Sequence, residues 1–210
     1  MTKVVGLVML MFLLAGCRNS GSNPVTTLPD SDAYGYLPLA KGNYWALQQS
    51  GNGWNGSKIR EIRTVINDTN HNILYGYVES VINDPLAQDA PATYYYVKKN
   101  GGIYLLQARS DIRHIDGSPF FSSEQLLLKS PVKIGANWVD GNSTWSIVDI
   151  VELSLHGNTF PQTAVVSNGI ETIWFAKNVG IVKQQVVSLP QPGLNDSPNV
   201  IQELRSFRFN

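Results

Sequence analysis

The stretch TYYYVKKNGGIYLLQA, residues 93–108, decides the fold class. Two runs rich in tyrosine, valine, isoleucine and leucine flank the turn sequence Lys-Asn-Gly-Gly. β-Branched and aromatic residues favour strands, while asparagine and glycine adopt the positive φ angles that a tight hairpin turn needs. The stretch therefore predicts two antiparallel strands, over 93–99 and 102–108.

The same composition recurs along most of the chain, with short turn sequences rich in Asn, Asp and Gly between the runs. It predicts six further strands, over 58–67, 73–82, 143–152, 170–177, 180–189 and 200–209. The nearest approach to a helix is SSEQLLLK, residues 122–129, with Ser122 or Ser123 as its N-cap. We predict an all-β fold, an antiparallel curved sheet that is barrel-like or a sandwich, with few short helices.

One predicted strand, 143–152, shows apolar residues on both of its faces. A period of two places Trp145, Ile147, Asp149 and Val151 on one face and Ser146, Val148 and Ile150 on the other. A sheet with water on one side would alternate more cleanly, so we expect the sheet to be covered on both sides or to curl around its own core.

Charge and composition narrow the classes of partner. The chain carries 16 basic and 16 acidic residues, and its longest basic run is Lys98-Lys99. This balance gives no electrostatic basis for binding nucleic acid or an anionic membrane surface. Past the N-terminus no segment approaches eighteen uninterrupted apolar residues, so we expect the body of the protein not to span a membrane.

Two segments share the pattern P-x-x-x-G-x-x-W. The first runs from Pro38 to Trp45 and the second from Pro131 to Trp138. Proline would fix an extended approach, glycine a turn, and tryptophan would bury its ring at the start of a strand. The match is either an internal duplication or a coincidence of short sequences.

The first of these segments, read as YLPLAKGNYW (36–45), and the segment WFAKNVGIVK (174–183) together resemble a broad group of uncharacterised exported bacterial proteins. Members of that group carry the motifs Y-x-P-L-x-x-G-x-x-W and (Y/F)-A-K-x-V-G-(I/L)-V-K. The two motifs bracket most of the chain after its N-terminal region. The resemblance implies a β-rich extracytoplasmic fold and implies no catalytic residue.

The motifs of common enzymes and metal sites are not found. His71, His114 and His156 are far apart in sequence and form no ligand pair, so we expect no metal site. The best polar cluster is DIRHIDG (111–117), which supplies at most two ligands on one strand face and is more simply a surface hairpin. No nucleophile elbow, phosphate-binding loop or dinucleotide fingerprint occurs, so we predict neither catalytic residues nor a cofactor.

Aromatic residues are the remaining candidates for ligand contact. Trp54 lies among glycines and asparagines, and a strand over 93–99 places Tyr94 and Tyr96 on one face and Tyr95 on the other. Rings on a rigid sheet suit stacking on sugars or gripping apolar ligands. The alternative, which we favour, is that Trp54 caps a sheet edge and the tyrosines pack structurally.

The N-terminus carries the signals of export. Lys3 precedes an apolar stretch, Val4 to Leu14, which is too short to cross a bilayer and reads as a signal-peptide core. The following Leu14-Ala15-Gly16-Cys17 resembles the lipobox of bacterial lipoproteins. That resemblance implies cleavage before Cys17 and lipidation of its thiol by the lipoprotein-processing machinery, so residues 1–16 are a cleaved signal peptide.

Residues 17–33 follow as a lipidated cysteine and a flexible tether rich in Ser, Asn, Pro and Thr, and residues 34–210 as a single β-rich domain. Two or three acyl chains together hold a protein durably on a membrane. Arg18 stands where an Asp would favour inner-membrane retention in enterobacterial lipoproteins, so the resemblance implies delivery to the outer membrane by the sorting machinery. Cys17 is the only cysteine, so no disulfide is available to the chain.

Three functional classes are compatible with this sequence. We favour a non-enzymatic binding or envelope-assembly module on a lipid anchor in the bacterial cell envelope, with an apolar or carbohydrate ligand. The second is a carrier or acceptor of lipid in a curved sheet, which a dry internal cavity would favour. The third is a hydrolase, which would need a positioned nucleophile or paired carboxylates.

Overall fold

The computed structural model describes residues 31–51, 54–83, 92–113, 119–187 and 199–210. These residues form one 3-10 turn and twelve strands. The turn, η1, spans Asp32–Tyr36 and so begins inside the stretch that the sequence analysis assigns to the tether. The strands are β1 (Tyr44–Gly51), β2 (Trp54–Asp68), β3 (Ile73–Asn83), β4 (Ala92–Lys99), β5 (Gly102–Arg113), β6 (Pro119–Lys129), β7 (Asn137–Asp140), β8 (Ser143–Leu155), β9 (Asn158–Ser167), β10 (Glu171–Ala176), β11 (Gly180–Val187) and β12 (Asn199–Arg208).

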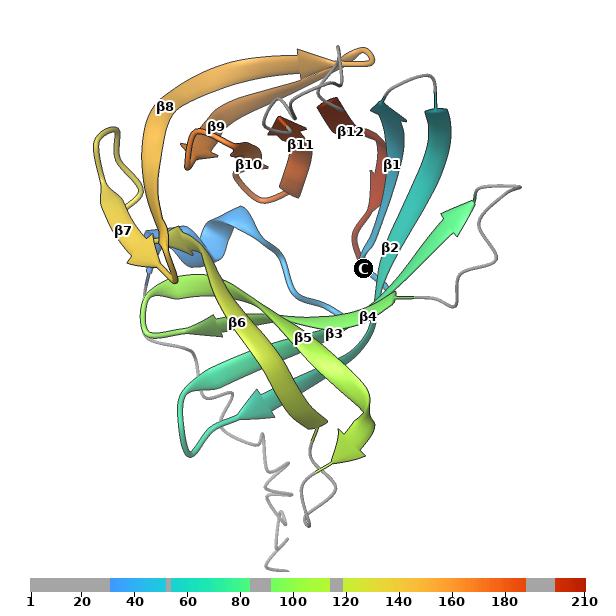
Figure 1. Cartoon of the computed structure of the whole chain (residues 1–210), viewed down its shortest axis with the longest axis vertical. Helices are drawn as coiled ribbons and strands as arrows, with labels where there is room; N and C mark the ends of the chain where they lie inside the picture. Colours follow the sequence, from blue (N-terminus) through green and yellow to red (C-terminus); the bar gives the residue numbers. More distant parts are fainter. Residues whose placement is uncertain (1–30, 52–53, 84–91, 114–118, 188–198) are drawn as a thin grey trace, which may run out of the picture.

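All twelve strands belong to one antiparallel sheet, in the order β6-β5-β4-β3-β2-β1-β12-β11-β10-β9-β8-β7. The sheet curls until its two edge strands, β6 and β7, face each other (Figure 1). Side chains bridge this seam, because Trp138 Nε1 donates to the carbonyl of Leu126 at 3.0 Å and the Leu126 amide donates to Asp140 at 3.2 Å. The predicted all-β, barrel-like antiparallel sheet is confirmed.

The two P-x-x-x-G-x-x-W segments have the same turn at their glycine, while only the second has a cis peptide bond before its proline, Ser130–Pro131. Their glycines, Gly42 and Gly135, have φ angles of 83° and 84°. The amide of Gly42 donates to the Ile62 carbonyl at 2.7 Å, and the amide of Gly135 donates to the Ile147 carbonyl at 2.8 Å. Each segment leads into the first of six consecutive strands, β1–β6 or β7–β12. The sequence match therefore corresponds to a shared turn. The two segments begin two similar halves of the sheet, β1–β6 and β7–β12.

A second pair of segments supports this division. The turn between the fourth and fifth strands of each half reads K-N-x-G-I, at 99–103 and at 177–181. Asn100 and Asn178 both adopt positive φ, at 49° and 63°. Asparagine tolerates this left-handed conformation better than most residues because its short polar side chain bonds locally. Both turns thus place an asparagine at positive φ, but the first links its strands through two residues, 100–101, and the second through three, 177–179.

The core lies within the curled sheet and is built from the inward faces of both halves. Its largest fully buried side chains include those of Trp45, Phe175, Leu37, Leu47, Ile62, Ile147 and Leu204. The turn η1 packs against the hairpin turns of both halves. The Gly101 amide donates to the Tyr34 hydroxyl at 3.0 Å, and the Asn178 amide donates to the Gly35 carbonyl at 2.6 Å.

All eight predicted strands are present, but the predicted short helix at 122–129 is wrong. That segment belongs to β6 and pairs with β5 along most of its length. The run Leu126-Leu127-Leu128 suits a buried helix or a buried strand equally, so pairing with a neighbouring strand decides its conformation. Within the described residues, no helix is long and apolar enough to cross a membrane.

The strict alternation predicted for 143–152 is also wrong beyond Ile147. Trp145 and Ile147 are buried, but a register shift follows between Ile147 and Asp149, and Asp149 is exposed. An extra residue reverses the faces of the strand residues that follow, and a second register shift, between Val151 and Leu153, reverses them again. The apolar residues on both faces of this strand are therefore explained by the two register shifts together with the curled sheet.

Candidate functional site

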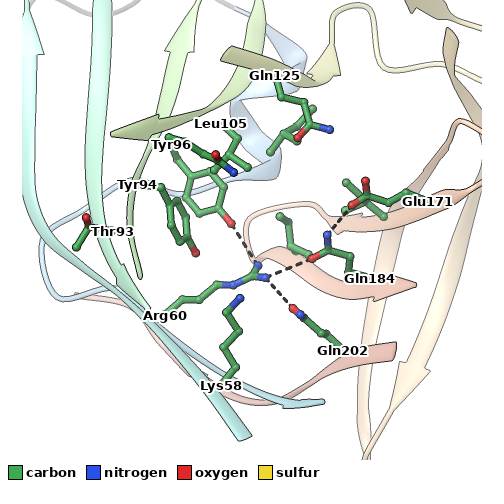
Figure 2. Close-up of a pocket in the computed structure, with 14 residues that line it drawn as sticks. Lys58, Arg60, Thr93, Tyr94, Tyr96, Leu105, Gln125, Glu171, Gln184 and Gln202 are labelled. Carbon is green, nitrogen blue, oxygen red and sulfur yellow. Dashed lines mark hydrogen bonds between the residues drawn. The ribbon is translucent and has the colours of Figure 1, made fainter. Parts of the chain in front are cut away.

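A pocket of about 580 Å³ opens into the interior of the sheet beside the apolar core (Figure 2). Such volumes are typical of small-molecule sites, about 300–1,000 Å³. Strands from both halves of the sheet contribute to its wall. The wall residues are Lys58, Arg60, Thr93, Tyr94, Tyr96, Leu105, Gln107, Gln125, Leu127, Glu171, Ile173, Ile181, Gln184 and Gln202.

Arg60 on β2 is the central polar side chain of the pocket and is only 6% exposed. Its Nη1 donates to the Tyr96 hydroxyl at 3.2 Å. Its Nη2 donates to Gln202 Oε1 at 2.8 Å and to Gln184 Oε1 at 3.3 Å. The guanidinium is thus held by three neutral oxygens from three different strands, and each contact fixes its position from another direction.

The charge of Arg60 has no counter-ion in contact. Among the described residues no carboxylate forms an ion pair with it, and its buried Nε has no hydrogen-bond partner. The nearest acidic wall residue, Glu171, instead accepts a hydrogen bond from Gln184 Nε2 at 2.6 Å. An amide therefore separates the carboxylate from the guanidinium, and a buried positive charge is left facing the pocket.

Lys58 adds a second positive charge from the same face of β2. Burial, and then the neighbouring Arg60, lower the pKa of its ammonium to about 8. The pocket thus contains two cationic side chains and, among its described wall residues, one carboxylate, Glu171. Burying charges of one sign together is unfavourable for the folded state, so these cations reduce stability unless something compensates them.

This cost leads to a prediction for Lys58→Met. We expect the substitution to raise the free energy of unfolding at pH 7 by about 1–2 kcal/mol, less than the full pKa difference because the ammonium is partly solvated. The pKa of Lys58 falls from its ordinary 10.5 to about 8 in the folded protein, so its penalty is complete below pH 8 and disappears as the pH rises through 10.5. Urea denaturation at several pH values measures this difference.

The matched control is Lys133→Met, since Lys133 is exposed. Its effect on the free energy of unfolding at pH 7 should be small, because substitutions of exposed residues usually change stability by less than about 0.5 kcal/mol. A loss of stability in Lys58→Met at pH 7, or a gain equal at pH 7 and pH 10.5, would show that the Lys58 charge is not penalised by burial.

The structure brings two of the three predicted aromatic candidates to the pocket. Tyr94 and Tyr96 both line it, with their rings 5.3 Å apart and nearly perpendicular, while Tyr95 packs against Tyr75 and Tyr77 on the opposite face. Burial, and then Tyr96, raise the pKa of Tyr94 well above its usual value, so its hydroxyl stays protonated. The side chain of Trp54 lies outside the described residues.

Two of the three histidines are described, His71 in the turn between β2 and β3 and His156 in the turn between β8 and β9. His71 is exposed and contacts Asp68 at 2.8 Å, while His114 and Asp116 lie outside the described residues. Within the described part of the chain, no three His, Cys, Asp or Glu side chains gather as a metal site would require. Cys17 likewise lies outside the described residues.

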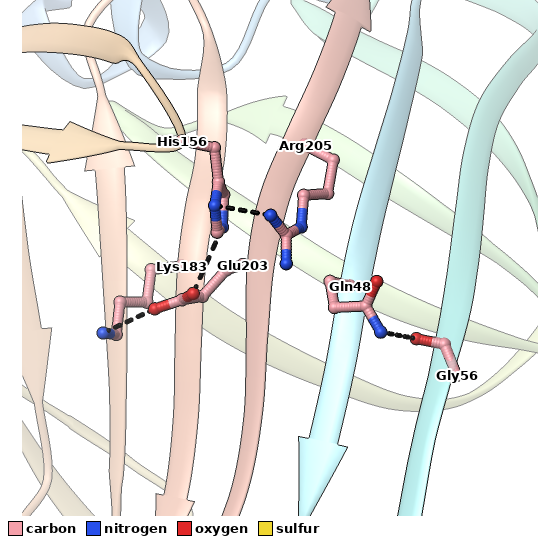
Figure 3. A network of polar contacts seen from close by, with 6 residues as sticks. All are labelled: Gln48, Gly56, His156, Lys183, Glu203 and Arg205. Carbon is pink, nitrogen blue, oxygen red and sulfur yellow. Dashed lines mark hydrogen bonds and ion pairs between the residues drawn. The ribbon is translucent and has the colours of Figure 1, made fainter.

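His156 instead belongs to a network on the outer face of the sheet (Figure 3). Its Nδ1 lies 2.6 Å from Arg205 Nη1, and its Nε2 lies 3.3 Å from Glu203, which also pairs with Lys183 at 2.9 Å. Because a guanidinium only donates, His156 Nδ1 must accept, which leaves the proton on Nε2 facing Glu203. The network ties the turn between β8 and β9 to β12.

The residues that sequence reasoning missed are Lys58, Arg60, Glu171, Gln184 and Gln202. In the segment KIREI (58–62) a period of two places Lys58, Arg60 and Ile62 on one face and Ile59 and Glu61 on the other, so neither face is clearly apolar or polar. The structure turns the face with Lys58 and Arg60 toward the pocket. The inner face of a curled sheet can carry polar side chains around a pocket. The alternation of polar and apolar residues along a strand does not predict which polar residues lie there.

Comparison with known proteins finds a similarity of structure only. No family model matches the chain, and no curated protein sequence matches it. A protein of Parabacteroides distasonis ATCC 8503 assigned as a lipoprotein superposes with a TM-score of 0.51 and 10% identity, covering 86% of this chain and 100% of that one. A protein of Bacteroides fragilis NCTC 9343 assigned as exported, with a YmcC-like fold, gives 0.52 and 9%, covering 82% and 98%. The chain therefore shares the fold of these two solved structures.

Proposed function

We propose that the mature chain is a lipid-anchored protein of the bacterial cell envelope that binds a small polyhydroxylated ligand, such as a carbohydrate, in the pocket of its curled sheet. The pocket itself carries the proposal, because it joins amide and hydroxyl groups to two tyrosine rings inside a rigid sheet. Amides both donate and accept hydrogen bonds, as sugar hydroxyls do, and aromatic rings offer apolar faces beside them.

Export and anchoring rest on the N-terminal sequence and on the kind of protein that shares the fold. The lipobox-like Leu14-Ala15-Gly16-Cys17 supplies a lipidation site, and the two solved structures with this fold come from proteins assigned as a lipoprotein and as exported. Arg18 favours the outer membrane as the destination. The partners in this proposal are the membrane, through the lipid, and the lipoprotein-processing and sorting machinery.

The character of the pocket wall favours a polar ligand over an acyl chain. A lipid carrier would place methylene groups against Arg60 and Lys58, whose charges would then be buried without compensation. Binding is also favoured over hydrolysis. Glu171 is the one carboxylate among the described wall residues, and it is hydrogen-bonded to Gln184. Paired carboxylates or a nucleophile beside a base would be expected of a hydrolase.

Native mass spectrometry of the mature chain, released from detergent micelles, tests this proposal. Titration with oligosaccharides of the envelope should give saturable adducts of intact oligosaccharide mass. Adducts restricted to fatty acid or phospholipid beyond the covalent anchor would contradict it, and so would cleavage of the oligosaccharide.

Two glutamine variants locate the site in the same experiment. Gln125→Leu alters the pocket wall and should reduce the fraction of adduct, whereas Gln48→Leu alters the opposite face of the sheet, where Gln48 donates to the Gly56 carbonyl, and should not. Equal effects of the two substitutions would place binding elsewhere.

A further inference from the structure

We infer that the ligand carries an anionic group, a carboxylate or a phosphate, that Arg60 and Lys58 hold inside the pocket. This inference rests on the proposed function and names the chemistry of its ligand.

Arg60 has more N–H donors than hydrogen-bond partners among the described residues. A guanidinium has five N–H bonds, and Arg60 uses three of them on Tyr96, Gln184 and Gln202. Its Nε is buried without a partner among the described residues. Leaving a charged donor buried and unsatisfied costs more than leaving a neutral one, so an acceptor is expected to complete the site. A carboxylate or phosphate offers several acceptor oxygens and the opposite charge.

The two halves of the sheet differ at the position of Arg60. Arg60 pairs with Trp45 of the first P-x-x-x-G-x-x-W segment, and Trp145 pairs with Trp138 of the second. Arg60 and Trp145 therefore occupy equivalent positions, and the second half fills this position with a buried aromatic ring. A buried apolar side chain such as Trp145 is sufficient to stabilise the fold at this position. A role in binding therefore explains the buried arginine of the first half better than a role in stability.

Positive charge exceeds negative charge among the described residues of the pocket wall. The titratable groups that line the pocket are Lys58 and Arg60 from β2, Tyr94 and Tyr96 from β4, and Glu171 from β10. Tyr94 stays protonated because burial raises its pKa, so the charged groups among the described wall residues are two cations and one carboxylate. A bound anion would offset this excess, and the glutamines that line other parts of the wall would contact the uncharged part of the ligand. An acidic sugar combines both features.

A matched pair of sugars isolates the anionic group. Galacturonate and galactose differ only in a carboxylate that replaces a hydroxymethyl group. Isothermal titration calorimetry of the mature chain in detergent micelles should give a dissociation constant at least tenfold lower for galacturonate. Inorganic phosphate is the third probe, and it distinguishes a site for the free anion from a site for an acidic sugar.

The variants assign the effect to the two cations. Arg60→Gln should weaken galacturonate binding by at least tenfold and abolish the preference for galacturonate over galactose. Arg63→Gln is the control, because Arg63 lies on the same strand but pairs with Glu61 and Glu79 on the exposed side of the sheet. If Arg60→Gln fails to fold by circular dichroism, Lys58→Met tests the same inference at the neighbouring cation, with an expected loss of about three- to tenfold.

Each outcome has a definite meaning. Binding of phosphate alone, lost in Arg60→Gln, supports the anion site and identifies its ligand as the free anion and not an acidic sugar. Equal binding of galactose and galacturonate, unaffected by Arg60→Gln, overturns this inference and leaves the proposed function intact. Binding of none of the three probes at millimolar concentration overturns the inference, and the oligosaccharide titration then decides the fate of the proposed function separately.

Discussion

Replacing Trp45 with alanine should lower the free energy of unfolding by about 3–5 kcal/mol, a large part of the roughly 5–15 kcal/mol that stabilises a typical domain. Trp45 is 2% exposed, and its Nε1 donates to the Val179 carbonyl at 2.7 Å. Its ring meets Phe209 edge-on, with 6.0 Å between the ring centroids. Alanine would leave a cavity and an unsatisfied carbonyl between the two halves of the sheet. Urea denaturation of the chain lacking residues 1–17 measures this loss.

Trp138→Ala should be similarly damaging, because Trp138 is 5% exposed and joins the seam by donating to Leu126. Trp54→Ala is the comparison, and its sequence setting among glycines and asparagines predicts a cost under about 0.5 kcal/mol. Equal losses in all three variants would contradict the distinction between the two motif tryptophans and Trp54. A loss below 1 kcal/mol in Trp45→Ala would contradict its place at the centre of the core.

Changing Cys17 to serine should abolish lipidation completely. Only the cysteine thiol can receive the diacylglycerol in the lipoprotein pathway that Leu14-Ala15-Gly16-Cys17 resembles, and cleavage at this site depends on that modification. The wild-type protein extracted from membranes should begin at Cys17 and carry the added diacylglycerol mass, whereas Cys17→Ser should be unlipidated and uncleaved at this site. Intact-protein mass spectrometry measures both properties in one spectrum.

Ser20→Ala is a suitable control, because it changes a nearby residue outside the lipobox-like sequence and should leave the mass of the lipid unaffected. An unmodified wild-type chain that begins at another residue would contradict the anchoring proposal. That result would leave the binding proposal standing, since the pocket lies entirely within the described strands.

Much of the fold was predictable because most strands carry their own signals. The hairpin over 93–108 combines aromatic strands with an Asn-Gly turn, and the structure places β4 and β5 there. The strands that were missed have weaker signals. β1 contains Gln48, Gln49 and Ser50, while β9 is interrupted by a proline and by Gln162 at a φ of 54°. Their pairing with neighbouring strands determines their conformation more than their own residues do.

The candidate site was less predictable than the fold. Tyr94 and Tyr96 were chosen from their alternation along a strand, and both line the pocket. Arg60 was missed because a charged residue on a strand is normally assigned to solvent, and its burial depends on strands more than 120 residues away along the chain. The residues next to Arg60 in the sequence do not indicate that it contacts Gln202. The pairing of β1 with both β2 and β12 brings Arg60 and Gln202 together.

If Arg60 receives an anion in the pocket, the resonance of its own Nε–H should report the binding directly. In a ¹H–¹⁵N correlation spectrum of the mature protein, assigned with Arg60→Gln, titration with galacturonate should shift the Arg60 Nε–H resonance saturably, in parallel with the calorimetric binding curve. Galactose at the same concentrations should not shift it. Saturable galacturonate binding that leaves the Arg60 resonance unmoved, or that shifts instead the resonance of Arg63 on the opposite face, would contradict binding of the anion by Arg60.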